Sequence, residues 1–173
     1  MKKNRLLATS ALLSALGVVI LLMGSISQVL DLSMAVITSI IIIYAVIELK
    51  GAWPYLIYAV TSVLSLLLLP DKFVAMVYAA FAGYYPILKF ILEKRLPRIP
   101  EWIIKIVVFN AALSVVVFVS THLLHIPAEE ISFGWLLYLG GNVVFVIYDL
   151  ALTNLISFYF FKLKKRLGLN KRK

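Results

Sequence analysis

The stretch KFILEKRLPRIPEWIIKIVVFNAALSVVVFVSTHLL, Lys89–Leu124, places a cluster of basic residues next to a long apolar run. The run from Trp102 to Leu124 contains a single lysine and no acidic residue. A hydrocarbon core about 30 Å thick is crossed by roughly 20 apolar residues in a helix. The run is therefore predicted to be a transmembrane helix, with the basic segment before it at a membrane surface.

Five further apolar runs occur along the chain. The six predicted spans are Leu6–Met23, Leu32–Ile47, Trp53–Leu69, Phe73–Leu88, Trp102–Leu124 and Phe133–Phe161. Each is expected to be helical, because an open strand in lipid would leave backbone groups without hydrogen bonds. The sequence predicts an all-α integral membrane bundle of six transmembrane helices, formed by residues 1–173 as a single domain.

The basic residues are distributed unequally between the two sides of this six-span layout. Sixteen of the seventeen fall on one side: Lys2, Lys3, Arg5, Lys50, Lys89, Lys94, Arg95, Arg98, Lys105, Lys162, Lys164, Lys165, Arg166, Lys171, Arg172 and Lys173. Lys72 is on the other side, where the connections carry Asp31, Asp71, Glu129 and Glu130. Because cytoplasmic loops retain Lys and Arg during insertion, both termini are predicted to be cytoplasmic in a multi-pass protein of the cell membrane.

The composition agrees with a membrane protein and excludes several other classes. Hydrophobic residues make up 63% of the chain, and the mean hydropathy is +1.02. The formal net charge of +9 would suggest nucleic-acid binding in a soluble protein, but here the basic residues lie at helix ends, where anionic lipids attract them. Membrane lipids are therefore expected partners and nucleic acid is not. The chain has no cysteine, which excludes disulfides and thiolate metal sites.

Proline and glycine predict irregularities in three places. Pro86 is expected to kink the inner third of the fourth span. The loop from Lys89 to Glu101 is expected to lie along the membrane surface through Leu92, Leu96 and Ile99. The last run is too long for one straight span, and Gly140-Gly141 is the expected point of a break or bend.

Asp149 is the first candidate for a functional residue, because it lies about midway along the sixth span. A carboxylate at that depth costs about 2.5–3.5 kcal/mol on insertion scales, so it should face the bundle and have a partner. Asn110 falls at nearly the same depth in the hairpin of the fifth and sixth spans. A hydrogen bond between Asn110 and Asp149 is therefore predicted. Its role is either functional or limited to locking the packing of the helices.

A polar and aromatic stripe continues from Asp149 toward the outer surface. Asn142 lies seven residues earlier on the same face, followed by Tyr138 and Trp135. Tyr78 and Tyr85 of the fourth span are placed to form a facing wall. Small-molecule pockets are mostly apolar and aromatic with a few placed polar groups, so these residues are predicted to bind a ligand. Packing and the interfacial aromatic belt are the alternative reading.

His122 and His125 are three residues apart near the outer end of the fifth span, with Glu129 close in sequence. Two histidines without a firm third ligand do not predict a metal site, and both are expected to be either interfacial polar residues or ligand contacts. The sequence has no glycine-rich phosphate loop, no HExxH motif and no ordered nucleophile, histidine and acid. No enzymatic activity, metal or cofactor is therefore expected.

The first span has a stripe of small residues formed by Ala8, Ala11 and Ala15. Small residues at such spacing allow another helix to approach closely. The stripe serves either packing within the bundle or contact with a partner protein.

Taken together, the six spans and the segment Ala11-Leu12-Leu13-Ser14-Ala15 in a first helix after a basic N-terminus make the chain resemble the substrate-binding S components of energy-coupling factor (ECF) transporters. The last run, with Asn142 to Leu150 and the basic end from Lys162, is similar to their closing helix. In that family an Ala-x-x-x-Ala motif contacts the transmembrane T component, which implies that Ala11 and Ala15 do so here.

The resemblance also implies a function. An S component captures a vitamin, a vitamin precursor or another micronutrient near the outer face and reorients in the membrane, driven by two ATPase subunits through the T component. Trp135, Tyr138 and Asn142 would lie where such proteins hold ligand, and His125 is similar to a ligand-contacting histidine of some thiamine-binding members. The full thiamine signature is absent, so no substrate is assigned.

Two other classes remain open. A small membrane scaffold, such as the rod-shape-determining membrane protein D family, would have a similar number of spans and no ligand pocket. A membrane enzyme acting on lipids would need an acid, a base and a metal to converge, and the sequence shows no such group.

Overall fold

Every element in the described part of the chain, residues 2–27, 30–122 and 134–159 of the computed structural model, is a helix. The elements are α1 (Lys2–Ser27), α2 (Asp31–Tyr44), the π-helix η1 (Ala45–Leu49), α3 (Trp53–Leu68), α4 (Lys72–Val77), the π-helix η2 (Tyr78–Ala82), α5 (Tyr85–Arg95), α6 (Arg98–His122) and α8 (Gly134–Phe158). The predicted all-α fold is confirmed.

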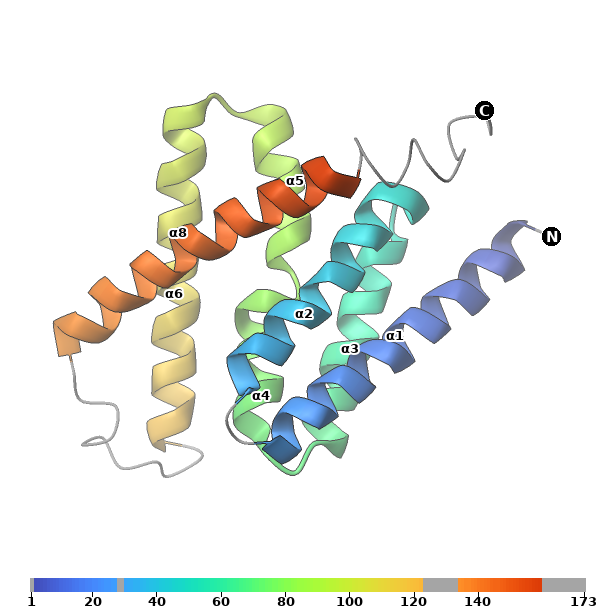
Figure 1. Cartoon of the computed structure of the whole chain (residues 1–173), viewed down its shortest axis with the longest axis horizontal. Helices are drawn as coiled ribbons and strands as arrows, with labels where there is room; N and C mark the ends of the chain where they lie inside the picture. The colour runs from blue at the N-terminus through green and yellow to red at the C-terminus, as the bar shows by residue number, and fades with distance from the viewer. Residues whose placement is uncertain (1, 28–29, 123–133, 160–173) are drawn as a thin grey trace.

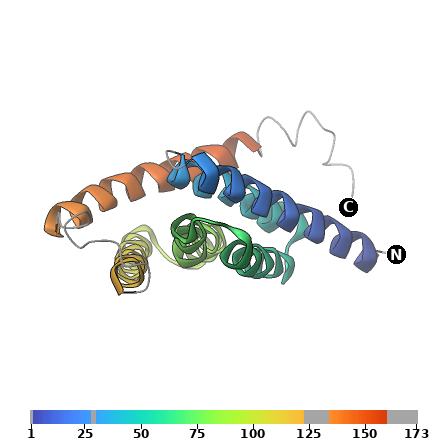
Figure 2. The same cartoon turned by 90° about the horizontal axis from the view of Figure 1, so that it is seen from below.

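The helices form two layers (Figure 2). Viewed from that side, α8, α2 and α1 form one layer, and α6, α4 with α5, and α3 form the other. In Figure 1 α8 lies obliquely across α5 and α6. This crossing brings residues of three helices together at one point and creates the candidate site described below.

Five helical segments are long and apolar enough to cross a membrane: Lys3–Ser27, Asp31–Leu49, Lys72–Arg95, Arg98–His122 and Gly134–Phe158. The predicted third span is shorter, since α3 contains 16 residues. At 1.5 Å per residue α3 extends about 24 Å, which is less than the usual hydrocarbon thickness. Length and composition therefore support five of the six predicted spans directly, with α3 a shorter apolar helix among them.

Basic and acidic helix ends lie on opposite sides of the bundle. In Figure 1 the start of α1 and the connections from η1 to α3 and from α5 to α6 lie toward the top, and the connection from α3 to α4 lies toward the bottom. The lone basic residue of the bottom side, Lys72, donates from Nζ to the carbonyls of Leu66 (2.9 Å) and Leu69 (2.7 Å) at the end of α3. A cation at a helix C-terminus is favourable, which explains this exception to the charge pattern.

Helices α1, α2 and α3 approach closely at a site made of small residues. A Cβ atom on Gly17 would lie 3.1 Å from Cγ2 of Thr61 in α3 and 3.3 Å from Cγ2 of Thr38 in α2. Ser14, one turn earlier, is buried on the same face of α1. Small residues at a helix crossing allow this close contact in a membrane, where lipid tails give no hydrophobic drive for association.

The fourth predicted span is a broken helix, as expected from its proline, but the break comes before Pro86. After η2 the regular helix is interrupted by a turn at Gly83 and Tyr84, whose dihedral angles remain in the right-handed helical region, and α5 restarts with Pro86 in its first turn. Proline is tolerated there, since its missing N–H would have had no partner. A Cβ on Gly83 would lie 2.6 Å from Cδ2 of Tyr58, whose hydroxyl donates to the carbonyl of Ala79 at 2.7 Å. The Tyr58 hydroxyl thus supplies a hydrogen bond to a backbone carbonyl of η2, next to the interruption.

The prediction of a surface loop from Lys89 to Glu101 is wrong. Residues up to Arg95 belong to α5, and α6 begins at Arg98. Leu96 between them is extended, with φ −118° and ψ 148°, because a residue before proline avoids the helical region. The connection is therefore a two-residue turn at Leu96 and Pro97.

The predicted break at Gly140-Gly141 is also wrong, because α8 is a continuous helix through both glycines. A Cβ on Gly141 would lie 3.2 Å from Cδ2 of Leu113 and 3.4 Å from Cζ of Phe109, both in α6. Gly141 therefore permits close packing of α8 on α6 and does not interrupt the helix.

The close approach at Gly17 gives a test of the packing of α1. Gly17→Leu is expected to lower the unfolding temperature of the purified protein, because overpacking typically costs about 1–3 kcal/mol. Gly140→Leu is the matched control, since a Cβ there meets no atom within 4 Å. Heating of both detergent-solubilised variants, followed by size-exclusion chromatography, measures the effect. Equal unfolding temperatures for the two variants would show that α1 does not pack as described.

Candidate functional site

Asp149 lies on the buried face of α8. The buried residues of this helix are Phe145, Tyr148, Asp149 and Leu152, which share one face at helical spacing. The Asp149 side chain is only 3% exposed. As the sequence predicted, the carboxylate faces the bundle and is partnered, but its partners differ from the prediction.

Helix α5 supplies three polar groups of the site, two of which contact Asp149. Tyr85, Lys89 and Glu93 are four residues apart and lie on one face. The Tyr85 hydroxyl donates to Oδ1 of Asp149 at 2.5 Å, and Nζ of Lys89 lies 2.6 Å from the same oxygen. Nζ of Lys89 is also 2.6 Å from Oε1 of Glu93. Lys89 thus bridges a carboxylate of its own helix and one of α8.

Helix α6 contributes the second lysine. Nζ of Lys105 lies 2.6 Å from Oε1 of Glu101, 3.0 Å from Oε1 of Glu93 and 3.1 Å from Oδ1 of Asp149. It also lies 5.4 Å from the centre of the Trp102 ring, within the range of a cation–π contact. Lys105 therefore connects all three helices of the site.

Two ammonium groups and three carboxylates form this site, which we call the charge cluster: Lys89, Lys105, Glu93, Glu101 and Asp149. The lysine side chains are 0% and 1% exposed, whereas Glu93 is 37% exposed and forms the edge of the cluster. Every buried ammonium group contacts at least two carboxylates. An ion removed from water costs several kcal/mol unless it is paired in this way, so the charge cluster holds α5, α6 and α8 at fixed positions.

A layer of aromatic rings adjoins the charge cluster. Phe109 and Phe145 are stacked with ring centres 4.7 Å apart, and Phe81 lies 5.2 Å from Phe109 and 4.7 Å from Tyr85. Tyr148 lies 5.6 Å from Tyr85. We call these five residues the aromatic layer. Tyr85 belongs to both features, since its ring packs in the layer and its hydroxyl binds Asp149.

An apolar cavity of about 380 Å³ lies on the other side of the aromatic layer. Four helical segments line it: the start of α2, α4 with η2, the second half of α6 and the first half of α8. The lining residues are Leu32, Ala35, Val36, Phe73, Val77, Phe81, Ala82, Phe109, Ala112, Leu113, Val116, Leu137, Gly141, Val144, Phe145 and Tyr148. The Tyr148 hydroxyl is the one polar side-chain group among them. The volume lies within the usual range of small-molecule sites, about 300–1,000 Å³.

The prediction that Asn110 pairs with Asp149 is wrong. Nδ2 of Asn110 donates to Oδ1 of Asn142 at 3.0 Å, and Nδ2 of Asn142 donates to Oδ1 of Asn110 at 3.1 Å. Further along the same two helices the hydroxyls of Ser114 and Tyr138 are 2.9 Å apart. The predicted register of α6 against α8 differs from the observed one by about two turns. In the observed register Asn110 meets Asn142, and Asp149 meets Lys105.

The predicted ligand-binding residues do not gather in one pocket. Asn110, Asn142 and Tyr138 hydrogen-bond across α6 and α8, and Trp135 is 76% exposed. Tyr78 packs in the core formed with α1 and α2.

Asp149 belongs to the charge cluster and Tyr85 contacts it, on the other side of the aromatic layer from the cavity. His122, at the end of α6, stacks on Phe118 with ring centres 4.4 Å apart. His125, Glu129 and Glu130 lie outside the described residues.

The residues that sequence analysis missed are Lys89, Glu93, Glu101 and Lys105. The lysines were read as charges at the membrane surface. A signal was present, because Lys89/Glu93 and Glu101/Lys105 are both oppositely charged pairs four residues apart. Each pair flanks or enters an apolar run, where a paired charge is less costly than a single one. No group of three metal-binding side chains occurs in the described ranges.

The small-residue stripe of α1 lies on the outside of the bundle. Ala8, Ala11 and Ala15 are exposed, whereas Ser10, Ser14 and Leu21 are buried on a neighbouring face of the helix. Of the two readings of this stripe, internal packing is therefore wrong, and the surface is open to lipid or to another helix.

No protein-family model matches this chain, and the searches of curated proteins and of solved structures also give no match. The resemblance to ECF S components consequently rests on the sequence features alone.

The charge cluster makes a direct prediction for stability. Asp149→Ala is expected to destabilise the protein by about 3–5 kcal/mol, because it leaves two buried ammonium groups with fewer partners. Leu150→Ala, at an exposed position next to it, is the control and should have little effect. Thermal unfolding of the purified variants measures the difference.

A double variant separates charge pairing from a general loss of packing. Lys89→Met combined with Asp149→Leu replaces an ion pair by apolar side chains, which is often neutral or stabilising. Lys105 keeps Glu93 and Glu101 as partners in this variant. The double variant should unfold at a higher temperature than Asp149→Ala. A wild-type unfolding temperature for Asp149→Ala would show that the charge cluster does not hold the helices together.

Proposed function

We propose that this protein is a membrane-embedded capture subunit that binds a largely apolar small molecule, in the manner of an ECF S component. The observation that carries the proposal is the apolar cavity between α2, α4, α6 and α8. It offers a site lined by four helices and closed at one end by the aromatic layer. Its lining favours an apolar or aromatic ligand over the polar or cationic compound suggested by the acidic and histidine residues of the sequence.

The position of the cavity agrees with capture from outside. Its lining residues come from the helix halves nearest the α3–α4 connection, opposite the basic helix ends. If the basic ends are cytoplasmic, as the distribution of Lys and Arg predicts, the cavity is in the outer half of the bundle. In this proposal the protein is in the cell membrane with both termini in the cytoplasm.

The exposed face of α1 supports docking on a membrane partner. Ala8, Ala11 and Ala15 present little side-chain volume, so a helix of a T component can approach the backbone of α1 closely. The sequence has no phosphate-binding loop, and ATPase subunits would have to supply the energy for uptake. The charge cluster would keep the base of the cavity rigid while the subunit reorients.

One observation favours a second function, that of a membrane scaffold. Apart from Tyr148, the cavity has no polar side chain to orient a micronutrient, so a lipid chain could fill it equally well. A scaffold of the rod-shape-determining D type would use the exposed faces of α1 and α8 for protein contacts and would retain no specific ligand.

Capture of a small molecule is tested by obstructing the cavity. Ala112→Phe places a ring in the cavity from a buried position of α6, whereas Ala111→Phe adds the same ring on the exposed face of that helix. Native mass spectrometry after gentle purification should show a bound small molecule in wild type and Ala111→Phe and its loss in Ala112→Phe. Retention of membrane lipid alone in all three proteins would favour the scaffold.

Partner docking is tested on the small-residue stripe. Ala11→Trp is expected to prevent co-purification of a transmembrane protein together with ATPases, because the bulky ring holds a partner helix away from α1. Met23→Trp is the control, since Met23 is exposed on the same helix about two turns beyond Ala15. Affinity purification from membranes of the native host, with proteins identified by mass spectrometry, gives the result. Recovery of ATPases with Ala11→Trp at the wild-type level would contradict docking through this stripe.

A further inference from the structure

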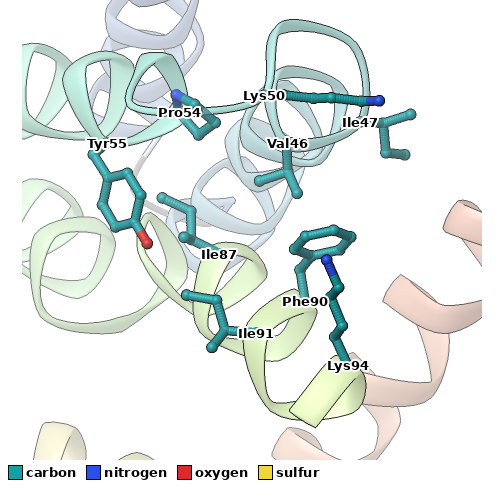
Figure 3. Close-up of a pocket in the computed structure, with 10 residues that line it drawn as sticks. Val46, Ile47, Lys50, Pro54, Tyr55, Ile87, Phe90, Ile91 and Lys94 are labelled. Atoms are coloured by element: carbon teal, nitrogen blue, oxygen red, sulfur yellow. The ribbon is translucent and has the colours of Figure 1, made fainter.

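A second cavity, of about 480 Å³, lies at the opposite end of the molecule from the apolar cavity. It is formed by the end of η1, the start of α3 and one face of α5. Figure 3 shows its apolar side chains, among them Val46, Ile87, Phe90 and Ile91. Tyr55 lies at its edge and brings a hydroxyl group close to these side chains.

Two lysines from different elements line this cavity. Lys50 ends η1 with a positive φ of 57°, which turns the chain toward α3, and Lys94 lies in the last turn of α5. In Figure 3 the Lys94 side chain runs beside Phe90 and directs its amine toward the helix end that carries Lys50. We call this cavity with its two amines the two-lysine pocket.

Unlike the amines of the charge cluster, these two amines form no ion pair with a carboxylate in the described part of the chain. No acidic residue lines the two-lysine pocket, and neither Lys50 nor Lys94 makes an ion pair with any residue in the ranges that the structure describes. Glu93, next to Lys94 in sequence, is turned to the other face of α5, where it binds Lys89 and Lys105. Among the described residues, nothing therefore compensates the positive charge of the two-lysine pocket.

We propose that the two-lysine pocket binds an anionic phospholipid of the leaflet at this end of the bundle. The phosphate lies between the two amines, and the upper part of an acyl chain packs on Ile87 and Ile91. A soluble anion would gain nothing from the apolar wall, and a zwitterionic lipid brings a cation that the lysines repel. Basic pockets between helix ends are known to select anionic headgroups on these physical grounds.

The location of the pocket supports a lipid as its occupant. It lies where η1 and α5 end and α3 begins, which is the side of the basic helix ends in Figure 1. A phosphate held there is at headgroup depth, with the apolar wall directed toward the hydrocarbon. The lipid would connect the η1–α3 turn to α5 and would stabilise the folded protein in proportion to its occupancy. The inference does not depend on the proposed function, because the pocket is separate from the ligand cavity.

The experiment uses the full-length protein purified in detergent, with added phosphatidylglycerol or phosphatidylcholine. Native mass spectrometry counts the lipid molecules retained. We expect selective retention of phosphatidylglycerol by wild type and a loss of affinity of about 25-fold in Lys50→Gln/Lys94→Gln, since each lysine near an anionic headgroup contributes a factor of about five.

The matched control is Arg95→Gln/Arg98→Gln. It removes the same charge from the same end of the bundle, but neither arginine lines the pocket. It should retain phosphatidylglycerol as wild type does. Lys50→Arg/Lys94→Arg should restore binding, because it restores both cations. Ile91→Trp, which keeps both lysines and obstructs the apolar wall, should weaken binding.

Three results would overturn the proposal. An equal loss in the arginine control would mean that the lipid responds to overall charge and not to the pocket. Equal retention of phosphatidylcholine by wild type would exclude selection of an anionic headgroup. Displacement by inorganic phosphate would identify a soluble anion as the occupant. If the glutamine variant is not monodisperse, comparison of Ile91→Trp with the arginine control decides among the same outcomes.

Discussion

The pairing of buried charges between α5, α6 and α8 determines the arrangement of the rest of the structure. An unpaired ion in an apolar bundle costs several kcal/mol, and α8 has few other buried residues to hold it in place. Asp149 accepts from Lys89 and Tyr85 of α5 and from Lys105 of α6, and these bonds set where α8 crosses the other two helices. At the end of α8, Tyr159 donates to Glu48 of η1 at 2.9 Å. Because α8 covers one side of the apolar cavity, the position of the cavity follows from this pairing.

The aromatic layer separates two environments that would otherwise weaken each other. Water entering the apolar cavity is kept from the charge cluster by the stacked rings of Phe109 and Phe145 and by Phe81. Ion pairs are stronger where water is excluded, so the layer preserves the strength of the charge cluster. Tyr85 couples the two regions directly, because a displacement of its ring would also move the hydroxyl that binds Asp149. A ligand that presses on the aromatic layer can therefore change the hydrogen bond between Tyr85 and Asp149, which helps to hold α8 in place.

The sequence predicted those features that depend on the membrane as a solvent. Hydropathy located the helices, and the distribution of Lys and Arg placed the basic helix ends on one side, because both patterns reflect transfer between water and lipid. The pairing of residues across helices was not predictable in the same way. It depends on the register of α6 against α8. The predicted register differs from the observed one by about two turns, so the prediction named Asn110 as the partner of Asp149 where the structure has Lys105. The reading of Lys89 and Lys105 as surface charges failed for a related reason, since composition cannot distinguish a lysine that reaches headgroups from one that meets a carboxylate of a distant helix.

The break between η2 and α5 explains how one helix can serve two unlike sites. Tyr85, Lys89 and Glu93 recur every four residues and face α6 and α8, whereas Ile87 and Ile91 are offset by two residues and face η1 and α3. Two residues turn a helix by about 200°, so the two sets lie on opposite faces. If α4 and α5 formed one continuous helix, the directions of these two faces would be fixed by the orientation of α4. The π-helical turn of η2 and the interruption at Gly83 release that constraint, and π-helical turns are frequent where a functional side chain must be re-aimed. The orientation of α5 is consequently set by its own charges, with the charge cluster on one face and the two-lysine pocket on the other.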